Sequence, residues 1–194
     1  SVANGAETLW SLQGPKSTPG ASIDSLIEAK LAEKKLKANA AASRAALVRR
    51  LHLDLTGLPP SDLSDKSDLA DLVDVLLSNP HFGERWGRHW LDIARYADGN
   101  GRDRNVMNYH AWRYRDYVIA SFNADKPYDV FIQEQIAGDL MPAKDTTQRD
   151  ERLTATAFLA LGAKAFEEQK QDLFHMDVVD EQIEVIGRGV LGLS

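Results

Sequence analysis

The chain has 194 residues and contains no cysteine. The lack of cysteine excludes disulfides, cysteine-ligated zinc, iron–sulfur clusters, a thiol nucleophile and covalent haem attachment within this chain. The 23 Lys and Arg against 29 Asp and Glu give a net charge of −6, which argues against a dedicated nucleic-acid binder. No apolar run approaches the roughly 20 residues of a membrane helix, so no transmembrane segment is expected.

The first 20 residues are expected to form an irregular segment, because glycines and prolines interrupt any regular pattern. Trp10 and Leu12 are its apolar anchors, and we expect the segment to dock onto the domain that follows. Residues 21–194 are predicted to form that single helical domain. Its apolar, glycine-spaced end lacks a polar tail, so we expect the natural chain to continue beyond Ser194 and the domain to be truncated there.

Beyond the irregular segment, apolar residues recur at helical spacing and predict about eight helices. Ser22 and Ser43 stand where helix N-caps are expected, Asp129 is a candidate cap for the sixth helix, and Gly57 is a candidate C-terminal stop. The predicted helices cover residues 22–31, 43–57, 69–77, 82–97, 108–123, 129–140, 149–161 and 172–188. No strand pattern of convincing length occurs, so the fold is predicted to be all-α and without internal repeats.

The predicted helix over residues 82–97 carries aromatic bulk beside a polar stripe. Trp86 and Trp90 lie one turn apart, and they are expected in the core. The polar stripe beside them, at positions i, i+4, i+7 and i+11, consists of Arg85, His89, Asp92 and Tyr96. A structural hydrogen-bonded network is the favoured interpretation of this stripe, and the wall of a binding or catalytic site is the alternative.

On the next predicted helix, Arg115 falls inside the apolar arc formed by Tyr109, Trp112, Tyr114, Val118, Ile119 and Phe122. A buried guanidinium needs a partner, so we expect Arg115 to be buried and to join this network through a carboxylate from another helix. Glu84, Asp92 and Asp98 are the candidate partners.

The loop over residues 98–105 fails the EF-hand pattern, and no two histidines have metal-ligand spacing, so no metal site is predicted. The mixed polar composition of the loop suits contact with an anion or a sugar. The candidate ligand-contacting residues in and after this loop are Arg102, Arg104, His110 and Arg113. Further along, Glu134 and Gln135 are interpreted as ordinary polar residues on a helix surface. No known catalytic motif occurs, and the catalytic residues, if any, remain unknown.

Three groups of segments together resemble the planctomycete cytochrome-C-associated domain of unknown function. They comprise residues 23–24, 29–31 and 47–60, then 79–86, 89–92 and 94–98, then 111–119, 127–129 and 134–140. The resemblance covers about residues 8–194. It implies that this chain is part of a large exported protein, located in the periplasm or at the cell surface. Such a protein combines this domain with a c-type cytochrome module and carbohydrate-binding-like modules. This chain itself shows no signal peptide.

The resemblance also implies where haem c would be attached. In the family, a segment like Leu191-Gly192-Leu193 runs into a C-x-x-C-H motif, and this chain stops at Ser194, before that motif. Haem c is therefore expected only outside this chain, in the full-length protein. A histidine of this chain could supply its second axial ligand, and the candidates are His81, His89 and His110.

Three functions follow from these observations. The favoured one is a helical structural or interaction module, linked to electron transfer near polysaccharide, with other domains of the parent protein and polysaccharide as partners. The first alternative is a part of a haem-assisted redox enzyme or hydrolase that acts on complex carbohydrate. The second alternative is a glycan-binding or small-anion-binding domain.

Overall fold

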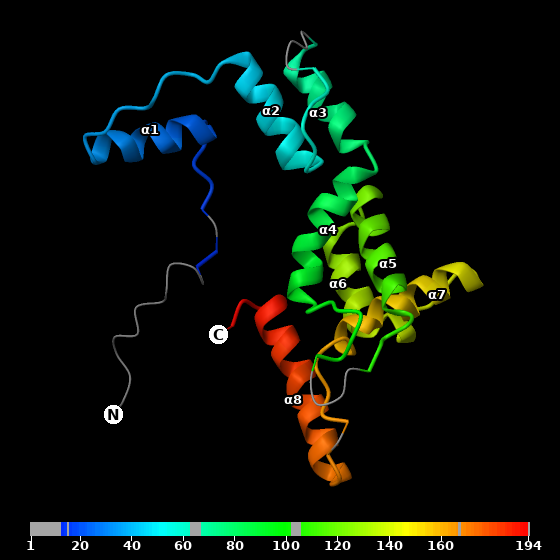
Figure 1. Cartoon of the computed structure of the whole chain (residues 1–194). Helices are drawn as coiled ribbons and strands as arrows, with labels where there is room; N and C mark the ends of the chain where they lie inside the picture. Colours follow the sequence, from blue (N-terminus) through cyan, green and yellow to red (C-terminus); the bar gives the residue numbers. More distant parts are fainter. Residues whose placement is uncertain (1–12, 15, 63–66, 102–105, 167, 194) are drawn as a thin grey trace, which may run out of the picture. The chain divides into compact units, whose positions relative to one another are not determined.

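The computed structural model describes residues 13–14, 16–62, 67–101, 106–166 and 168–193 (Figure 1). Within these residues the fold is all-α, as predicted, with eight α-helices, two short 3-10 helices and one isolated bridge between Gly99 and Met107. The helices are α1 (Ile23–Glu33), α2 (Arg44–Leu55), α3 (Leu69–Leu77), α4 (His81–Ile93), α5 (Ala111–Asn123), α6 (Tyr128–Ala137), α7 (Thr146–Ala155) and α8 (Gln171–Gly189), with η2 (Gly138–Leu140) and η3 (Thr156–Leu159). None of these helices is long and apolar enough to cross a membrane.

The chain divides into two units, Ser1–Ala42 and Ser43–Ser194. The first unit contains α1, whose N-terminus is closed by a reciprocal capping box. In this box Ser22 Oγ accepts from the Ser25 amide at 3.1 Å, and Ser25 Oγ accepts from the Ser22 amide at 2.9 Å. The docking predicted for Trp10 and Leu12 lies outside the described residues.

Helix ends in the second unit follow the capping residues. Ser43 caps α2 as predicted, and Gly57 follows that helix with a φ of 72°, in the left-handed region that favours glycine. Asp129 is not the cap of α6, because the helix begins one residue earlier, at Tyr128. Pro127 occupies the cap position there, and Asp129 lies in the first turn. Helix α4 ends at Ile93 rather than near residue 97, because Arg95 takes a φ of 55° and leaves the helical path.

The main core of the second unit lies where α4 and α5 run side by side (Figure 1). Trp90 is buried as predicted, and its ring lies 4.9 Å from Phe131 and 5.3 Å from Phe158 between ring centroids. Such aromatic pairs add to the stabilisation that comes from apolar burial. Trp86, which was expected in the same core, is instead 39% exposed. A smaller core of Val48, Leu72 and Leu76 joins α2 to α3.

Candidate functional site

Two polar residues interpreted from sequence as surface residues are buried in the core of the second unit. Glu134 is 4% exposed and Gln135 is 0% exposed, and both lie on α6. Buried polar groups are costly unless they are hydrogen-bonded, so the partners of each side chain matter. Gln135 Nε2 has no such partner within the described residues. The surface interpretation of these two residues is therefore wrong.

Glu134 lies at the centre of a buried cluster of charges. Lys126 Nζ and the Tyr117 hydroxyl donate to Glu134 Oε2, the latter at 2.7 Å, and Arg152 Nε donates to Oε1 at 3.2 Å. Burial alone would raise the pKa of Glu134, but the hydrogen bonds from Lys126, Tyr117 and Arg152 outweigh it and hold the pKa below its ordinary value. The carboxylate is thus ionised at neutral pH, and the cluster joins α5, α6 and α7.

Gln135 completes a second buried network. The Tyr114 hydroxyl donates to Gln135 Oε1 at 2.7 Å, and Trp90 Nε1 donates to the Tyr114 oxygen at 2.9 Å. Burial raises the pKa of the Tyr114 hydroxyl. Since these groups are enclosed and turned toward one another, they hold α4, α5 and α6 in register, and they present no reactive atom to a ligand.

The predicted polar stripe is brought together only in part. Arg85 Nη1 lies 3.3 Å from His89 Nε2, and the Tyr96 hydroxyl donates to Asp98 Oδ1 at 3.0 Å. Asp92 and His89 are both exposed. Within the stripe only Arg85 and His89 lie within hydrogen-bond distance of each other. Tyr96 pairs with Asp98 outside the stripe, and in the described part of the chain the Asp92 side chain bonds to neither pair.

The prediction that Arg115 is buried and paired with another helix is wrong. Its side chain is 45% exposed, and it donates to Asp116 Oδ1, on its own helix, at 2.8 Å and 3.0 Å. This hydrogen bond raises the pKa of Arg115. The buried face of α5 carries Tyr114, Tyr117 and Val118, and that face turns Arg115 outward.

An exposed arginine should contribute little to stability. We expect Arg115→Leu to change the free energy of unfolding by no more than about 0.5 kcal/mol, because exposed ion pairs contribute little. Urea denaturation of the variant and of the wild-type protein measures this difference. A loss of several kcal/mol in the free energy of unfolding would indicate that Arg115 is buried and paired after all.

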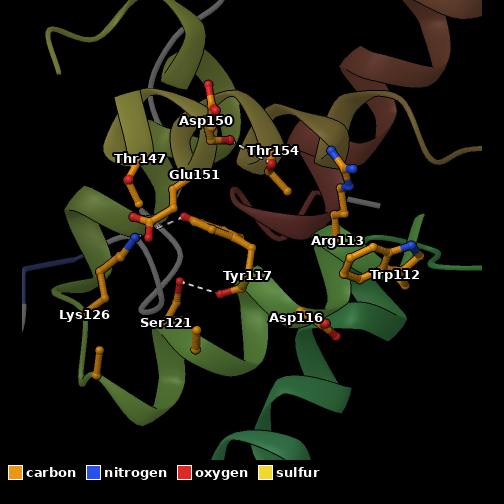
Figure 2. A pocket seen from close by; sticks show the side chains of 12 residues that line it. Trp112, Arg113, Asp116, Tyr117, Ser121, Lys126, Thr147, Asp150, Glu151 and Thr154 are labelled. Atoms are coloured by element: carbon orange, nitrogen blue, oxygen red, sulfur yellow. Dashed lines mark hydrogen bonds between the residues drawn. The ribbon is translucent and has the colours of Figure 1, made fainter. Parts of the chain in front are cut away.

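A hollow of about 590 Å³ lies between α5 and α7 (Figure 2). We call it the first hollow. The residues that line it are Trp112, Arg113, Asp116, Tyr117, Ala120, Ser121, Ala124, Lys126, Thr147, Asp150, Glu151 and Thr154. Lys126 is engaged with the buried Glu134, and Asp116 and Asp150 each accept from an adjacent arginine with one carboxylate oxygen. The lining thus offers an aromatic ring, carboxylate oxygens and hydroxyl groups to a ligand.

A second hollow, of about 490 Å³, adjoins the first. It is lined by Met107, Asn108, Tyr109, His110, Ala111, Arg113, Tyr114, Thr154, Ala157, Ala160 and Leu161. Arg113 and Thr154 line both hollows, so the two adjoin one another beside α5, and we call them together the strip. Trp112 in the first hollow is 45% exposed and Tyr109 in the second is 79% exposed, so each hollow has an aromatic side chain open to solvent.

The second hollow contains two of the four residues predicted to contact a ligand, His110 and Arg113. Arg102 and Arg104 lie outside the described residues. The sequence interpretation missed Asp150, Glu151 and Thr154, because no pattern on α7 indicates that this helix faces α5.

The three histidines proposed as haem ligands are all exposed. His81 Nδ1 lies 2.6 Å from Glu84 Oε2, and His110 alone of the three lines a hollow described above. No group of three or more histidine, aspartate or glutamate residues that could hold a metal ion occurs in the described part of the chain.

Comparison with protein families gives one match across almost the whole chain. The family model described as PSCyt2, a protein of unknown function (DUF1549), matches residues 22–194. The chain belongs to this family. The predicted membership of an uncharacterised domain family is thereby confirmed, while the planctomycete source and the cytochrome association remain predictions. Searches of curated proteins and of solved structures gave no match to this PSCyt2 domain.

Proposed function

We propose that this PSCyt2 domain is a helical binding module of a larger exported protein, and that the strip formed by the two hollows along α5 binds a segment of polysaccharide. The observation that supports this most directly is that the hollows share Arg113 and Thr154. Two adjoining hollows suit a chain-like ligand that contacts both of them.

The chemistry of the first hollow matches that of a sugar ring. The apolar face of a sugar ring packs on an aromatic side chain, and Trp112 offers such a face. Sugar hydroxyls donate to carboxylates and accept from guanidinium groups. Glu151 has no hydrogen-bond partner within the described residues, and Arg113, stacked 5.6 Å from the Trp112 ring centroid, has no ion pair there. Both groups are thus available to a hydroxyl-rich ligand.

The wider setting of this proposal comes from the family resemblance. The parent protein is exported to the periplasm or the cell surface and carries haem c in a module outside this chain. The other domains of that protein are the neighbours of the binding module. By binding polysaccharide, the module keeps the parent protein close to it. Electron transfer by the haem then takes place near polysaccharide.

Trp112 provides the test of the binding surface. We expect the purified domain to bind at least one oligosaccharide on a glycan array, and Trp112→Ala to weaken that binding about tenfold or more in titration calorimetry, because the stacking surface is lost. The fold should be retained, since Trp112 is half-exposed.

Trp86→Ala is the matched control. Trp86 is exposed to a similar extent, at 39%, but it lines neither hollow. Its replacement should leave the affinity unchanged. The absence of binding to any glycan on the array, or equal losses in the two tryptophan variants, would overturn the proposal.

A further inference from the structure

The two hollows differ in charge. The first is lined by three carboxylates, those of Asp116, Asp150 and Glu151. The second contains no carboxylate among its described lining residues, and its basic side chains are His110 and Arg113. The first hollow thus holds three carboxylates beside Arg113 and Lys126, and Lys126 is already paired with the buried Glu134, while the described lining of the second hollow holds basic groups without a carboxylate.

The donors of the second hollow are available to a ligand. No ion pair engages Arg113 and no hydrogen bond engages the His110 ring within the described residues, and the imidazole supplies at least one N–H donor in either tautomer. The Tyr114 hydroxyl, by contrast, is turned away toward Gln135. Arg113 and His110 therefore provide the strongest unused hydrogen-bond donors in the hollow.

We propose that the second hollow is an anion subsite, in which Arg113 and His110 bind an oxyanion carried by a sugar, a sulfate ester or a uronate carboxylate. The inference rests on the proposed function, because the anion is one substituent of the polysaccharide that lies along α5. A guanidinium group binds such oxyanions with paired hydrogen bonds, which are stronger than hydrogen bonds between neutral groups. The carboxylates of the first hollow repel a second anion, so the strip selects a chain with its acidic group at the His110 end.

The test uses a sulfated galactan oligosaccharide, the same oligosaccharide after chemical desulfation, and an oligouronate. Titration calorimetry at low salt should show the sulfated chain bound about tenfold or more tightly than its desulfated form, with a preference that declines as salt is added. The oligouronate shows which anionic group the subsite accepts. It should bind about as tightly as the sulfated chain if the subsite also accepts a carboxylate. A preference for either acidic chain supports the subsite, and equal affinity of all three chains would overturn it.

His110→Gln separates the subsite from the rest of the strip, because His110 lines only the second hollow. This variant should bind the sulfated chain several-fold more weakly and the desulfated chain as the wild-type protein does. Arg113→Gln should weaken both, since Arg113 lines both hollows. Arg88→Gln, an exposed charge change on α4, is the control and should alter neither. Retention of the full preference in His110→Gln would overturn the proposal.

The proposed function and the subsite fail in different ways. If no oligosaccharide binds, polysaccharide binding is wrong, and inorganic sulfate then tests the subsite alone. In that case sulfate at constant ionic strength should raise the melting temperature of the wild-type domain and not that of His110→Gln. If the sulfated chain, the desulfated chain and the oligouronate all bind equally well, polysaccharide binding stands and the anion subsite is wrong.

Discussion

Replacing Glu134 by glutamine should lower the free energy of unfolding by about 3 kcal/mol or more, because removal of one member of a buried ion pair leaves its partners uncompensated. The carboxylate is almost fully buried, and Lys126 and Arg152 are mostly buried beside it. The glutamine side chain keeps the volume, removes the charge and replaces one of the two accepting oxygens with an NH2 donor. For a domain of this size, the corresponding drop in melting temperature is about 10 °C.

The pH dependence of this loss identifies the ionised carboxylate as its source. The pKa of Glu134 is lowered in the folded protein, so its stabilisation is fully present above the unfolded-state pKa and is lost as the pH falls through the folded-state pKa. The difference between the wild-type protein and Glu134→Gln should therefore be complete at neutral pH. It should shrink as the pH falls below the unfolded-state glutamate pKa of about 4.3 and through the lower folded-state pKa.

Glu184→Gln is the matched control for urea denaturation at both pH values. Glu184 pairs with Arg188 one turn along α8, and both side chains are about half or more exposed. Its replacement should change the free energy of unfolding by about 0.5 kcal/mol or less. If Glu134→Gln is as stable as Glu184→Gln at neutral pH, the buried cluster contributes nothing to the stability of the fold.

Local patterns in the sequence were enough to predict the helices. The capping serines Ser22 and Ser43 and the left-handed Gly57 occupy the positions predicted for them, because capping depends on residues a few positions apart. The burial of Glu134 depends on partners on other elements. Lys126 lies eight residues before it and Arg152 eighteen residues after it, and no local period reveals that these charges meet.

The error at Arg115 has a related cause. The apolar arc of its helix was drawn through Tyr109 and Trp112, and both of these aromatic side chains are substantially exposed. Aromatic residues with a polar tip are stable at a surface, so they mark the core less reliably than aliphatic residues do. The same two side chains stand in the hollows beside His110 and Arg113. The two residues that led to the wrong prediction of the core thus belong to the candidate binding surface.

The contact between α4 and α5 limits the residues that the α4 face can carry. Gly83 and Gly87 are buried on that face, one turn apart. A Cβ at Gly83 would lie 2.4 Å from the Ile119 carbonyl oxygen and 2.7 Å from the Asn123 side chain. Asn123 Oδ1 accepts from the Gly83 amide at 2.8 Å, and Asn123 Nδ2 donates to the Pro80 oxygen at 3.1 Å. Thus α5 satisfies one amide in the first turn of α4, beside the His81 amide that donates to Asn79 Oδ1 at 3.0 Å.

Gly83→Ala should therefore destabilise the domain by about 3 kcal/mol, because a backbone oxygen cannot move aside as a flexible side chain can. Gly87→Ala is the control one turn away. A Cβ there would meet its nearest neighbour, Val118 Cγ1, at 3.4 Å, an ordinary contact, and alanine favours the helix by about 1 kcal/mol over glycine. Urea denaturation should thus show a large loss at Gly83 and a change within about 1 kcal/mol at Gly87. Equal effects at the two positions would contradict the close approach of α4 and α5, since the substitutions differ only in what the new methyl group meets.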